Sequence, residues 1–373
     1  MQLCHNIFFT AVISIITSFN GFPQEEHQSP FHFEFMKIQE DVFLAYRPEP
    51  LRYLVEGNCT IIINDDDVVV VDATGSPQGA RQIIREIKKL TDKPVKYLIN
   101  THGHGDHTIG NTEFLNAFPG IDIIAHPETR NYLTAEQGRI NYVKDIAGSI
   151  DSRIDYMNAE IQKVKAEAYP GYEKVVANLV QYRDHDLPLR QETYKQVIIT
   201  PPNITFEDRM ILHSGDREIQ LLHLGKGDTA GDVWVYLPRE KILCSGDAVV
   251  NPVPYGFSRH GIEWLQTLKK AADLDFTTLI PGHGEVQKDK EYLKLYITLL
   301  EEISVQINKS IASGLTKEET INNINILEIE ERFTKEDALL RYYFNAYFKE
   351  PHFDRVYDLI KNEYDMAKAA NKK

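Results

Sequence analysis

From residue 35 onward the chain begins with segments whose apolar pattern predicts strands. Residues 35–47 and 51–64 are strand-like, with turn residues between them. Residues 68–73 (VVVVDA) form a mostly apolar run that ends on Asp72, which indicates a strand of the buried kind. Residues 95–100 (VKYLIN) repeat this pattern and lead directly into a histidine-rich segment. The chain therefore begins its folded part with strands.

Helical spacing follows the first of these buried strands. Residues 77–90 carry Pro77 in a first-turn position and place several isoleucines on one face, so we expect a helix there. A short helix over 111–118 and a strand over 121–125 come next. Residues 127–191 are long, charged and helical in spacing, which predicts a helical insertion.

Strand signals return after the insertion. We expect strands at 195–200 and through 204–224, and then three units of a strand followed by a loop, which lie at 233–238, 241–247 and 277–284. From residue 288 onward the spacing is helical. Strands followed by helices, twice over, predict a layered α/β sandwich.

Charge and composition narrow the class of protein. The 373 residues include 41 Lys+Arg and 55 Asp+Glu, a net charge of −14. This balance argues against a nucleic-acid partner, because such binding rests on basic side chains at phosphates. We expect a small-molecule substrate instead. No apolar run reaches the ~20 residues of a membrane helix, so no stable membrane insertion is expected.

The N-terminus resembles an export signal. Residues 7–19 (IFFTAVISIITSF) are apolar and precede a polar break, although no Lys or Arg occurs before Lys37. We predict a signal peptide over residues 1–22 and a periplasmic or secreted protein. The alternative is a buried or interfacial helix in a cytoplasmic protein. Cys59 and Cys244 sit in apolar segments and are interpreted as small buried hydrophobes, not as a disulfide.

The strongest chemical signal is THGHGDH, directly after the predicted strand 95–100. Neutral imidazoles and a carboxylate suit Zn²⁺ and similar ions. In an extended segment residues two apart project the same way, so His102 and His104 can share one metal. Asp106 and His107 follow a glycine and can turn toward a second one. The alternative is a solvated histidine-rich loop.

This segment resembles the H-x-H-x-D-H motif of the metallo-β-lactamase superfamily. The other motifs of that family appear in order, in VVVVDA with Asp72, LGKGDTAGD, CSGDAVV with Asp247, and IPGHGE with His283. The resemblance covers about residues 36–310. It implies a four-layer αββα sandwich over residues 30–310, interrupted by the helical insertion 127–191 and followed by a helical C-terminal extension at 311–373.

The resemblance also implies a site with two metal ions, of which zinc is the first expectation. His102 and His104 would bind the first ion, and Asp247 would bridge to the second. The second ion would take Asp106, His107 and His283. Asp72 would stand behind the site and orient a ligand imidazole or the metal loop. The alternative for Asp72 is a plain capping residue at the end of its strand.

One motif departs from the family. Where the third motif usually has a histidine, this chain has Asp228. We expect Asp228 to complete the first metal site, since a carboxylate can bind a metal. Alternatively it bonds a metal-bound water, the first site is weaker than usual, or His223 replaces the missing ligand. An added carboxylate makes iron or manganese suitable alongside zinc.

The activity implied is that of a metal-dependent hydrolase in which a metal-bound hydroxide attacks and Asp106 orients the nucleophile and moves its proton. Amide, ester, lactone, thioester and phosphodiester substrates all remain open, β-lactamase-like amides among them. Two alternatives come from other classes. One is an iron-dependent oxidoreductase similar to sulfur dioxygenases, and the other is a non-catalytic member that binds a metal or ligand.

Two further segments concern the substrate. In the loop 251–260, Tyr255, Arg259 and His260 are candidate substrate contacts, with a rim role as the alternative. Aromatic residues of the C-terminal helices have helical spacing, which favours a packed interface over a ligand cage. They are Tyr342, Tyr343, Phe344, Tyr347 and Phe348. Such an interface is a lid, an intramolecular cover or the contact of a homo-oligomer.

Overall fold

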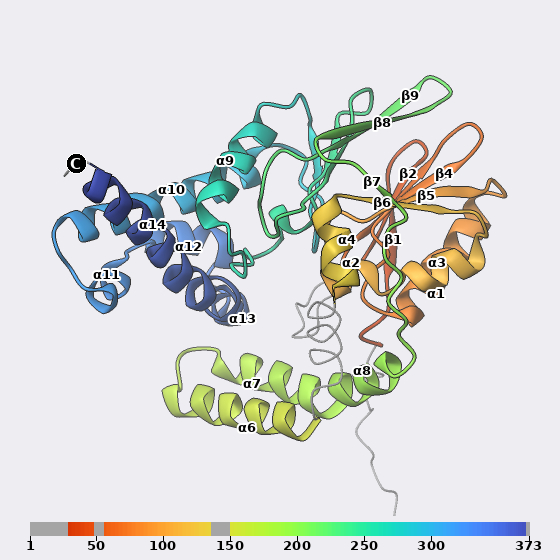
Figure 1. The fold of residues 1–373 in the computed structure, drawn as a ribbon. Coiled ribbons are helices and arrows are strands. Elements are labelled where there is room, and N and C mark those ends of the chain that lie inside the picture. Colours follow the sequence, from red (N-terminus) through yellow and green to blue (C-terminus); the bar gives the residue numbers. More distant parts are fainter. Residues whose placement is uncertain (1–28, 48–55, 136–149, 371–373) are drawn as a thin grey trace, which may run out of the picture.

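The structure, a computed structural model, describes residues 29–47, 56–135 and 150–370. The predicted signal peptide, residues 1–22, lies outside the described residues. The described part contains two sheets that pack face to face (Figure 1). One has seven strands in the order β1 to β7, and the other has five in the order β12-β11-β10-β9-β8. The seven strands of the first sheet are β1 (Glu34–Gln39), β2 (Val42–Tyr46), β3 (Cys59–Ile63), β4 (Val68–Val71), β5 (Val95–Ile99), β6 (Asp122–Ala125) and β7 (Ile204–Thr205).

The first sheet changes direction at β4. Strands β1 to β4 are antiparallel neighbours, whereas β4 to β7 run parallel. Parallel strands need a crossover between them, and α1 (Pro77–Leu90) and α3 (Asn111–Ala117) lie in the first two crossovers. The Ser76 side chain caps α1 by accepting a hydrogen bond from the Gly79 N–H.

The second sheet consists of β8 (Arg209–Ser214), β9 (Arg217–Leu222), β10 (Trp234–Leu237), β11 (Ile242–Cys244) and β12 (Thr278–Ile280). Its strands are antiparallel except for β11 and β12, which are parallel. Helix α9 (Gly261–Ala272) lies in the connection between those two strands. The second sheet therefore also has a pair of parallel strands whose carboxyl ends meet at one edge.

The expected strand at 195–200 is wrong, because this segment is a loop. Its carbonyl groups accept hydrogen bonds from side chains of α3, as in Thr112 Oγ1 to the Ile198 oxygen at 2.7 Å and Asn111 Nδ2 to the Thr200 oxygen at 2.9 Å. Val197 and Ile199 pack on a small cluster around Ile109. Apolar residues at alternate positions here serve a local cluster, so the alternation did not mark a strand.

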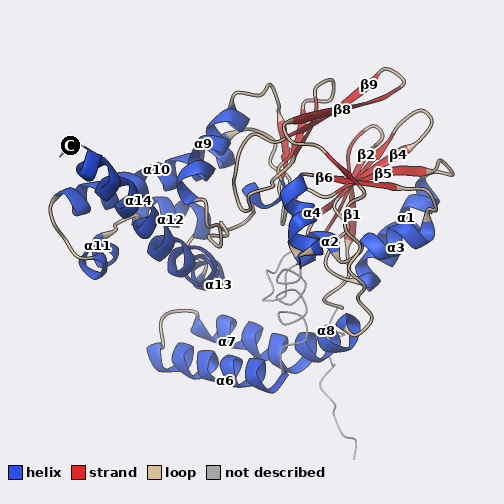
Figure 2. Ribbon diagram, viewed as in Figure 1, coloured by secondary structure: helices blue, strands red, loops and turns tan. Residues whose placement is uncertain are grey.

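Three apolar clusters hold the two sheets and the helices together as four layers. One cluster fills the space between the two sheets, with Leu44, Val69 and Ile99 from the first sheet and Leu221 and Val235 from the second. A second cluster joins the first sheet to α1 and α3. A third joins the second sheet to α9 and to α10 (Glu291–Ala312). The arrangement is the predicted αββα sandwich (Figure 2).

Two helical segments extend this sandwich. The insertion contains α4 (Pro127–Thr134), α6 (Ile150–Glu167), α7 (Tyr172–Gln181), the π-helical turn η1 (Tyr182–Asp186) and α8 (Leu187–Tyr194). After α10 the chain forms α11 (Lys317–Asn323), α12 (Leu327–Thr334), α13 (Ala338–Tyr343), the π-helical segment η3 (Phe344–Lys349) and α14 (Glu350–Ala370). Helices α7 and α13 contact each other, so the insertion and the extension pack together (Figure 1).

The aromatic residues of the extension mostly point into the molecule. Tyr343, Phe344 and Phe348 are fully buried, and the Tyr343 hydroxyl donates to Asn178 Oδ1 of α7 at 2.5 Å. These three residues therefore pack within the chain, and a contact between copies of the chain stays a prediction. Across the described ranges, every helix is too short or too polar to cross a membrane.

Candidate metal centre

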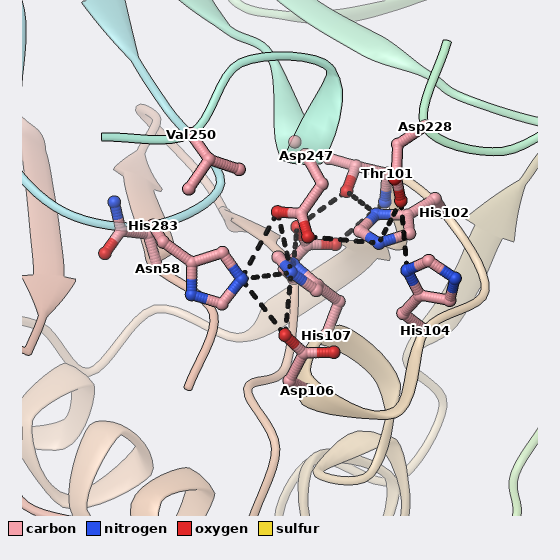
Figure 3. A network of polar contacts seen from close by, with 12 residues as sticks. Asn58, Thr101, His102, His104, Asp106, His107, Asp228, Asp247, Val250 and His283 are labelled. Carbon is pink, nitrogen blue, oxygen red and sulfur yellow. Dashed lines mark hydrogen bonds and ion pairs between the residues drawn. The ribbon is translucent and has the colours of Figure 1, made fainter. Parts of the chain in front are cut away.

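The site lies where carboxyl ends of strands from both sheets meet. His102 follows β5, Asp247 lies on the 3-10 turn η2 (Gly246–Ala248) just after β11, and His283 follows β12. Because β11 and β12 are parallel neighbours, the loops that follow them leave the sheet at the same edge. Figure 3 shows the three side chains pointing toward one another.

The histidine-rich loop turns sharply so that its donors face two ways. His104 precedes the single-turn helix α2 (Gly105–Thr108), which carries Asp106 and His107. Main-chain hydrogen bonds hold this turn, from the Ala73 N–H to the His107 oxygen at 2.8 Å and from the Gly57 N–H to the Asp106 oxygen at 3.0 Å. The short helix thus separates the direction of His102 and His104 from that of the next two donors.

One donor group consists of Asp106, His107, Asp247 and His283, whose candidate ligand atoms all lie within 4.8 Å of one another. His283 Nε2 lies 3.0 Å from Asp106 Oδ2 and 3.3 Å from Asp247 Oδ1. His107 Nε2 lies 3.1 Å from Asp247 Oδ1. These are the four residues expected around the second ion, and we call them the second donor group.

The other donor group consists of His102, His104, Asp228 and Asp247, which meet the same distance limit. His104 Nδ1 lies 3.0 Å from Asp228 Oδ2. His102 Nε2 lies 3.7 Å from both Asp228 Oδ2 and Asp247 Oδ2. Asp247 belongs to both groups, as a bridging carboxylate would (Figure 3). We call this the first donor group.

The donor atoms fit a cation better than they fit one another. His102 Nε2 is buried and makes no hydrogen bond within the described part of the chain, because the two carboxylates at 3.7 Å are too distant. His107 Nε2 and His283 Nε2 face each other at 3.2 Å. A buried nitrogen without a partner is costly, and a shared cation satisfies it. Imidazole and carboxylate donors suit zinc, iron or manganese.

His223 lies outside both donor groups. Its Nδ1 contacts the Asp232 main-chain oxygen at 2.9 Å, and its ring stacks on His126 with ring centroids 4.2 Å apart. The substitute role considered for His223 is therefore not supported, and Asp228 occupies the position where a third ligand of the first group was expected.

Asp72 stands directly behind the second donor group. Its Oδ2 lies 2.8 Å from His107 Nδ1, and its two oxygens accept from the Thr101 N–H at 2.8 Å and the Thr101 hydroxyl at 2.7 Å. A carboxylate on the far nitrogen of a ligand imidazole fixes the ring and directs the other nitrogen at the metal. This is the position that the orienting role requires.

Asp232 is a residue that the sequence did not single out. It is buried, and it accepts hydrogen bonds from the Asp228 N–H at 2.7 Å, the Thr229 N–H at 2.9 Å and the Thr229 hydroxyl. Burial, together with the nearby Asp228, raises the pKa of Asp232 to about 8. It lies within the quoted motif LGKGDTAGD, which was the only signal available for it.

Two close approaches also support the second group. A Cβ at position 57 would collide with the His107 ring, and one at position 282 would collide with the Asp247 carboxylate, so both positions require glycine. Asn58 joins the two sheets here, since its Nδ2 donates to the main-chain oxygens of Pro281 and Gly284 at 2.9 Å each. Glycine and asparagine in a loop carry no such signal in sequence.

Glu56 is a second buried acid that the sequence did not single out. Its Oε2 accepts from the Thr74 hydroxyl at 2.6 Å and from the Gly75 N–H at 3.0 Å, so it holds the loop that leads from β4 into α1. Burial raises the pKa of Glu56 to about 7. Its role is to hold the loop that packs against Asp106, rather than to donate to a metal.

Charges within the site are balanced by protons when no metal is bound. Burial favours the neutral ring of His283, but the carboxylates of Asp247 and Asp106 outweigh this effect and raise its pKa to about 9. Burial also favours the neutral ring of His104, but Asp228 outweighs this effect and raises the pKa of His104 to about 9. Metal binding requires neutral imidazoles, so an ion entering this site displaces these protons.

A pocket of about 280 Å³ opens over the donors. Tyr255 lines it, as expected of a substrate contact. Arg259 and His260 do not belong to its lining. The His260 N–H donates to the Ser258 hydroxyl. The complete lining is His104, Asp106, Asp228, Asp247, Tyr255, Phe257 and Tyr347. Tyr347 comes from η3, so one of the aromatic residues assigned to packing reaches the site.

Comparison with known proteins agrees with this geometry. A family model described as the metallo-beta-lactamase superfamily matches residues 52–283. The chain is 24% identical over 277 residues to a linear primary-alkylsulfatase of Pseudomonas sp. (strain ATCC 19151), covering 70% of this chain and 48% of that protein. It is 20% identical over 302 residues to the beta-lactamase-like protein 2 homolog of Caenorhabditis elegans, covering 80% and 75%.

Solved structures show the same fold. The sec-alkylsulfatase Pisa1 from Pseudomonas sp. matches with a TM-score of 0.59 at 17% identity, over 87% of this chain and 50% of that chain. The DIM-1 metallo-beta-lactamase matches with a TM-score of 0.50 at 20% identity, over 72% and 97%. The chain spans about half the length of the two alkylsulfatases.

Proposed function

Because the chain belongs to the metallo-β-lactamase superfamily, we propose that it is a metal-dependent hydrolase, with alkyl sulfate esters as the first substrates to test. One observation carries the proposal. Two complete donor groups share Asp247 at the base of a pocket. Two donor groups with all their expected ligands favour a catalytic protein over a non-catalytic member of the superfamily. The relatives named as alkylsulfatases supply the candidate substrate.

The two donor groups provide ligands for two ions. His102, His104 and Asp228 would hold one ion, Asp106, His107 and His283 the other, and Asp247 both. When bound, two such ions supply a water of lowered pKa and polarise an oxygen of the substrate.

Asp106 is the candidate proton acceptor. Its carboxylate is 19% exposed and lines the pocket, whereas those of Asp228 and Asp247 are almost covered. Before a metal binds, burial raises the pKa of Asp106, but His107 and His283 lower it to well below its usual range. A bound cation would take over this effect and keep the carboxylate anionic. An anionic carboxylate at this place orients a water by accepting its hydrogen bond and can take its proton.

The first experiment is metal content, measured by mass spectrometry on protein purified without added metal, together with hydrolysis of alkyl sulfates. We expect two equivalents of zinc in the wild type and one in Asp228→Ala. One equivalent in both proteins, or two equivalents without any hydrolysis of sulfate, β-lactam, lactone, thioester or phosphodiester substrates, would contradict the proposal.

A second candidate is the iron-dependent dioxygenase. It is favoured by Asp228, which adds a third carboxylate to the donor set and makes the site more suitable for iron. Iron in the purified protein, with oxygen uptake in the presence of a thiol or persulfide substrate, would select this candidate over the hydrolase.

A further inference from the structure

The pocket over the donors has two chemically different sides. Four of its lining residues are donors that would hold metal, namely His104, Asp106, Asp228 and Asp247. The remaining three are aromatic, namely Tyr255, Phe257 and Tyr347, and we call them the aromatic wall. A reacting group bound at the donors therefore has carbon surface directly beside it.

The three rings of the aromatic wall contact one another and form one surface. The centroids of Tyr255 and Tyr347 lie 5.2 Å apart in an edge-to-face arrangement, and those of Phe257 and Tyr347 lie 5.9 Å apart. Tyr255 also lies 5.3 Å from the His283 ring, so the wall reaches the second donor group. Such aromatic pairs are favourable in themselves, which keeps the surface in place without a ligand.

The wall depends on the C-terminal extension. The Gly256 N–H donates to the Tyr347 main-chain oxygen at 2.7 Å, and the guanidinium of Arg355 on α14 donates to the Phe257 main-chain oxygen. A Cβ at position 256 would collide with the Phe348 main-chain oxygen, so the loop can approach η3 this closely only with glycine there. The extension thus fixes the loop that carries Tyr255 and Phe257 and adds Tyr347 itself.

Tyr347 lies on the π-helical segment η3. This segment lies between α13 and α14, and its wider turn shifts the side chains relative to those of a continuous α-helix. Tyr343 remains buried, whereas Tyr347 is 8% exposed and faces the pocket, with ring centroids 4.9 Å apart. Phe257, at 43% exposed, stands at the mouth.

We propose that the aromatic wall is a subsite for the apolar alkyl or aryl group of a small anionic substrate, and that Tyr347 is a residue that determines specificity for this group. The inference rests on the proposed function in taking that group to be part of a substrate. A pocket of about 280 Å³ is at the small end for ligand sites. Divalent cations held by the two donor groups would attract an anionic head group.

The test uses the metal-loaded full chain and a series of alkanesulfonates from ethane- to hexanesulfonate, which contain no ester bond. Calorimetric titration gives the affinity of each. We expect affinity to rise by about fourfold for each buried methylene in the wild type and in Tyr347→Phe. Tyr347→Ala should bind ethanesulfonate normally but lose most of this dependence on chain length. Tyr342→Ala, in the neighbouring turn, is the matched control and should retain it.

Two results would overturn the inference. One is an affinity in the wild type that does not depend on chain length, and the other is an undiminished dependence in folded Tyr347→Ala. If that variant does not fold, as judged by circular dichroism, Phe257→Ala at the pocket mouth replaces it with the same expectation. Length-dependent binding without hydrolysis of the matching alkyl sulfates would support the subsite and contradict alkyl sulfates as the substrates of the proposed hydrolase.

Discussion

The two donor groups share Asp247 but differ in how the fold supports them. In the second group, His107 is fully buried and held from behind by Asp72, and Asp106 reaches the pocket. The first group borders the pocket, where His104 has a side chain 38% exposed, and its Asp228 stands on a loop fixed mainly by Asp232. The fold therefore holds a ligand ring of the second group through its side chain, but supports the first group through the main chain of Asp228. We expect the first group to be the one that varies in metal and affinity.

The largest expected effect is loss of the second group. His107→Ala and His283→Ala should each lose the second ion and reduce hydrolysis by more than about 100-fold, since losing a ligand costs more than losing a residue behind it. Metal content and initial rates measure both effects. His213→Ala, an exposed position on β8, is the control. Full activity in both variants would refute the assignment of this group.

The next largest effects are expected at Asp72 and Asp232. Each lies behind one donor group, so their variants should affect different ions. Asp72→Asn should weaken the second ion by about 10- to 100-fold, and Asp232→Asn should weaken the first by a similar factor. Titration of each ion against a chelator distinguishes them, with Asp122→Asn as the control. If both variants weakened the same ion, the division into two groups would be wrong.

Asp228→His tests the first donor group by strengthening it instead of weakening it. An imidazole suits zinc better than a carboxylate does, so this variant should bind zinc in the first group several-fold more tightly while the second group is unchanged. Competition with a zinc chelator at fixed pH measures this. Weaker zinc binding would mean that Asp228 has another task than ligation.

The smallest effect concerns a buried histidine outside both groups. His352 lies against Trp264 and Phe348, and burial, with a smaller contribution from Arg355, lowers its pKa to about 3. The carboxylates around His104, His107 and His283 raise the pKa of these rings, whereas the surroundings of His352 favour the neutral ring. Because the unfolded chain takes up a proton near pH 6.5 and the folded chain does not, stability falls as pH drops from 6.5 toward 3, by up to about 1.4 kcal/mol per pH unit.

His352→Phe should remove this part of the acid sensitivity. Urea unfolding at pH 7.5 and 5.5 gives the free energy of unfolding at each pH, and the variant should lose about 1 kcal/mol less between them than the wild type. An identical loss in both proteins would show that the His352 ring becomes charged in the folded state.

Much of the fold was predictable because its signals are local. The valine run at β4 and the isoleucine face of α1 place their elements directly, and the order of strands and helices indicates the sandwich. The segment 195–200 shows the limit of this reasoning. Its alternating apolar residues pack on a local cluster while its carbonyls bond to α3, and nothing in the alternation distinguishes that from a strand.

The sequence by itself determined which donors a single loop can present, because neighbouring residues in THGHGDH have directions set by local backbone geometry. Tertiary structure alone decided how distant segments meet that loop. Asp247 comes between the donor groups because β11 runs parallel to β12. Asp232 and Tyr347 acquire their tasks from the loops they touch. Helical spacing told which face of the extension is apolar, but only packing decides which residue of that face reaches the pocket.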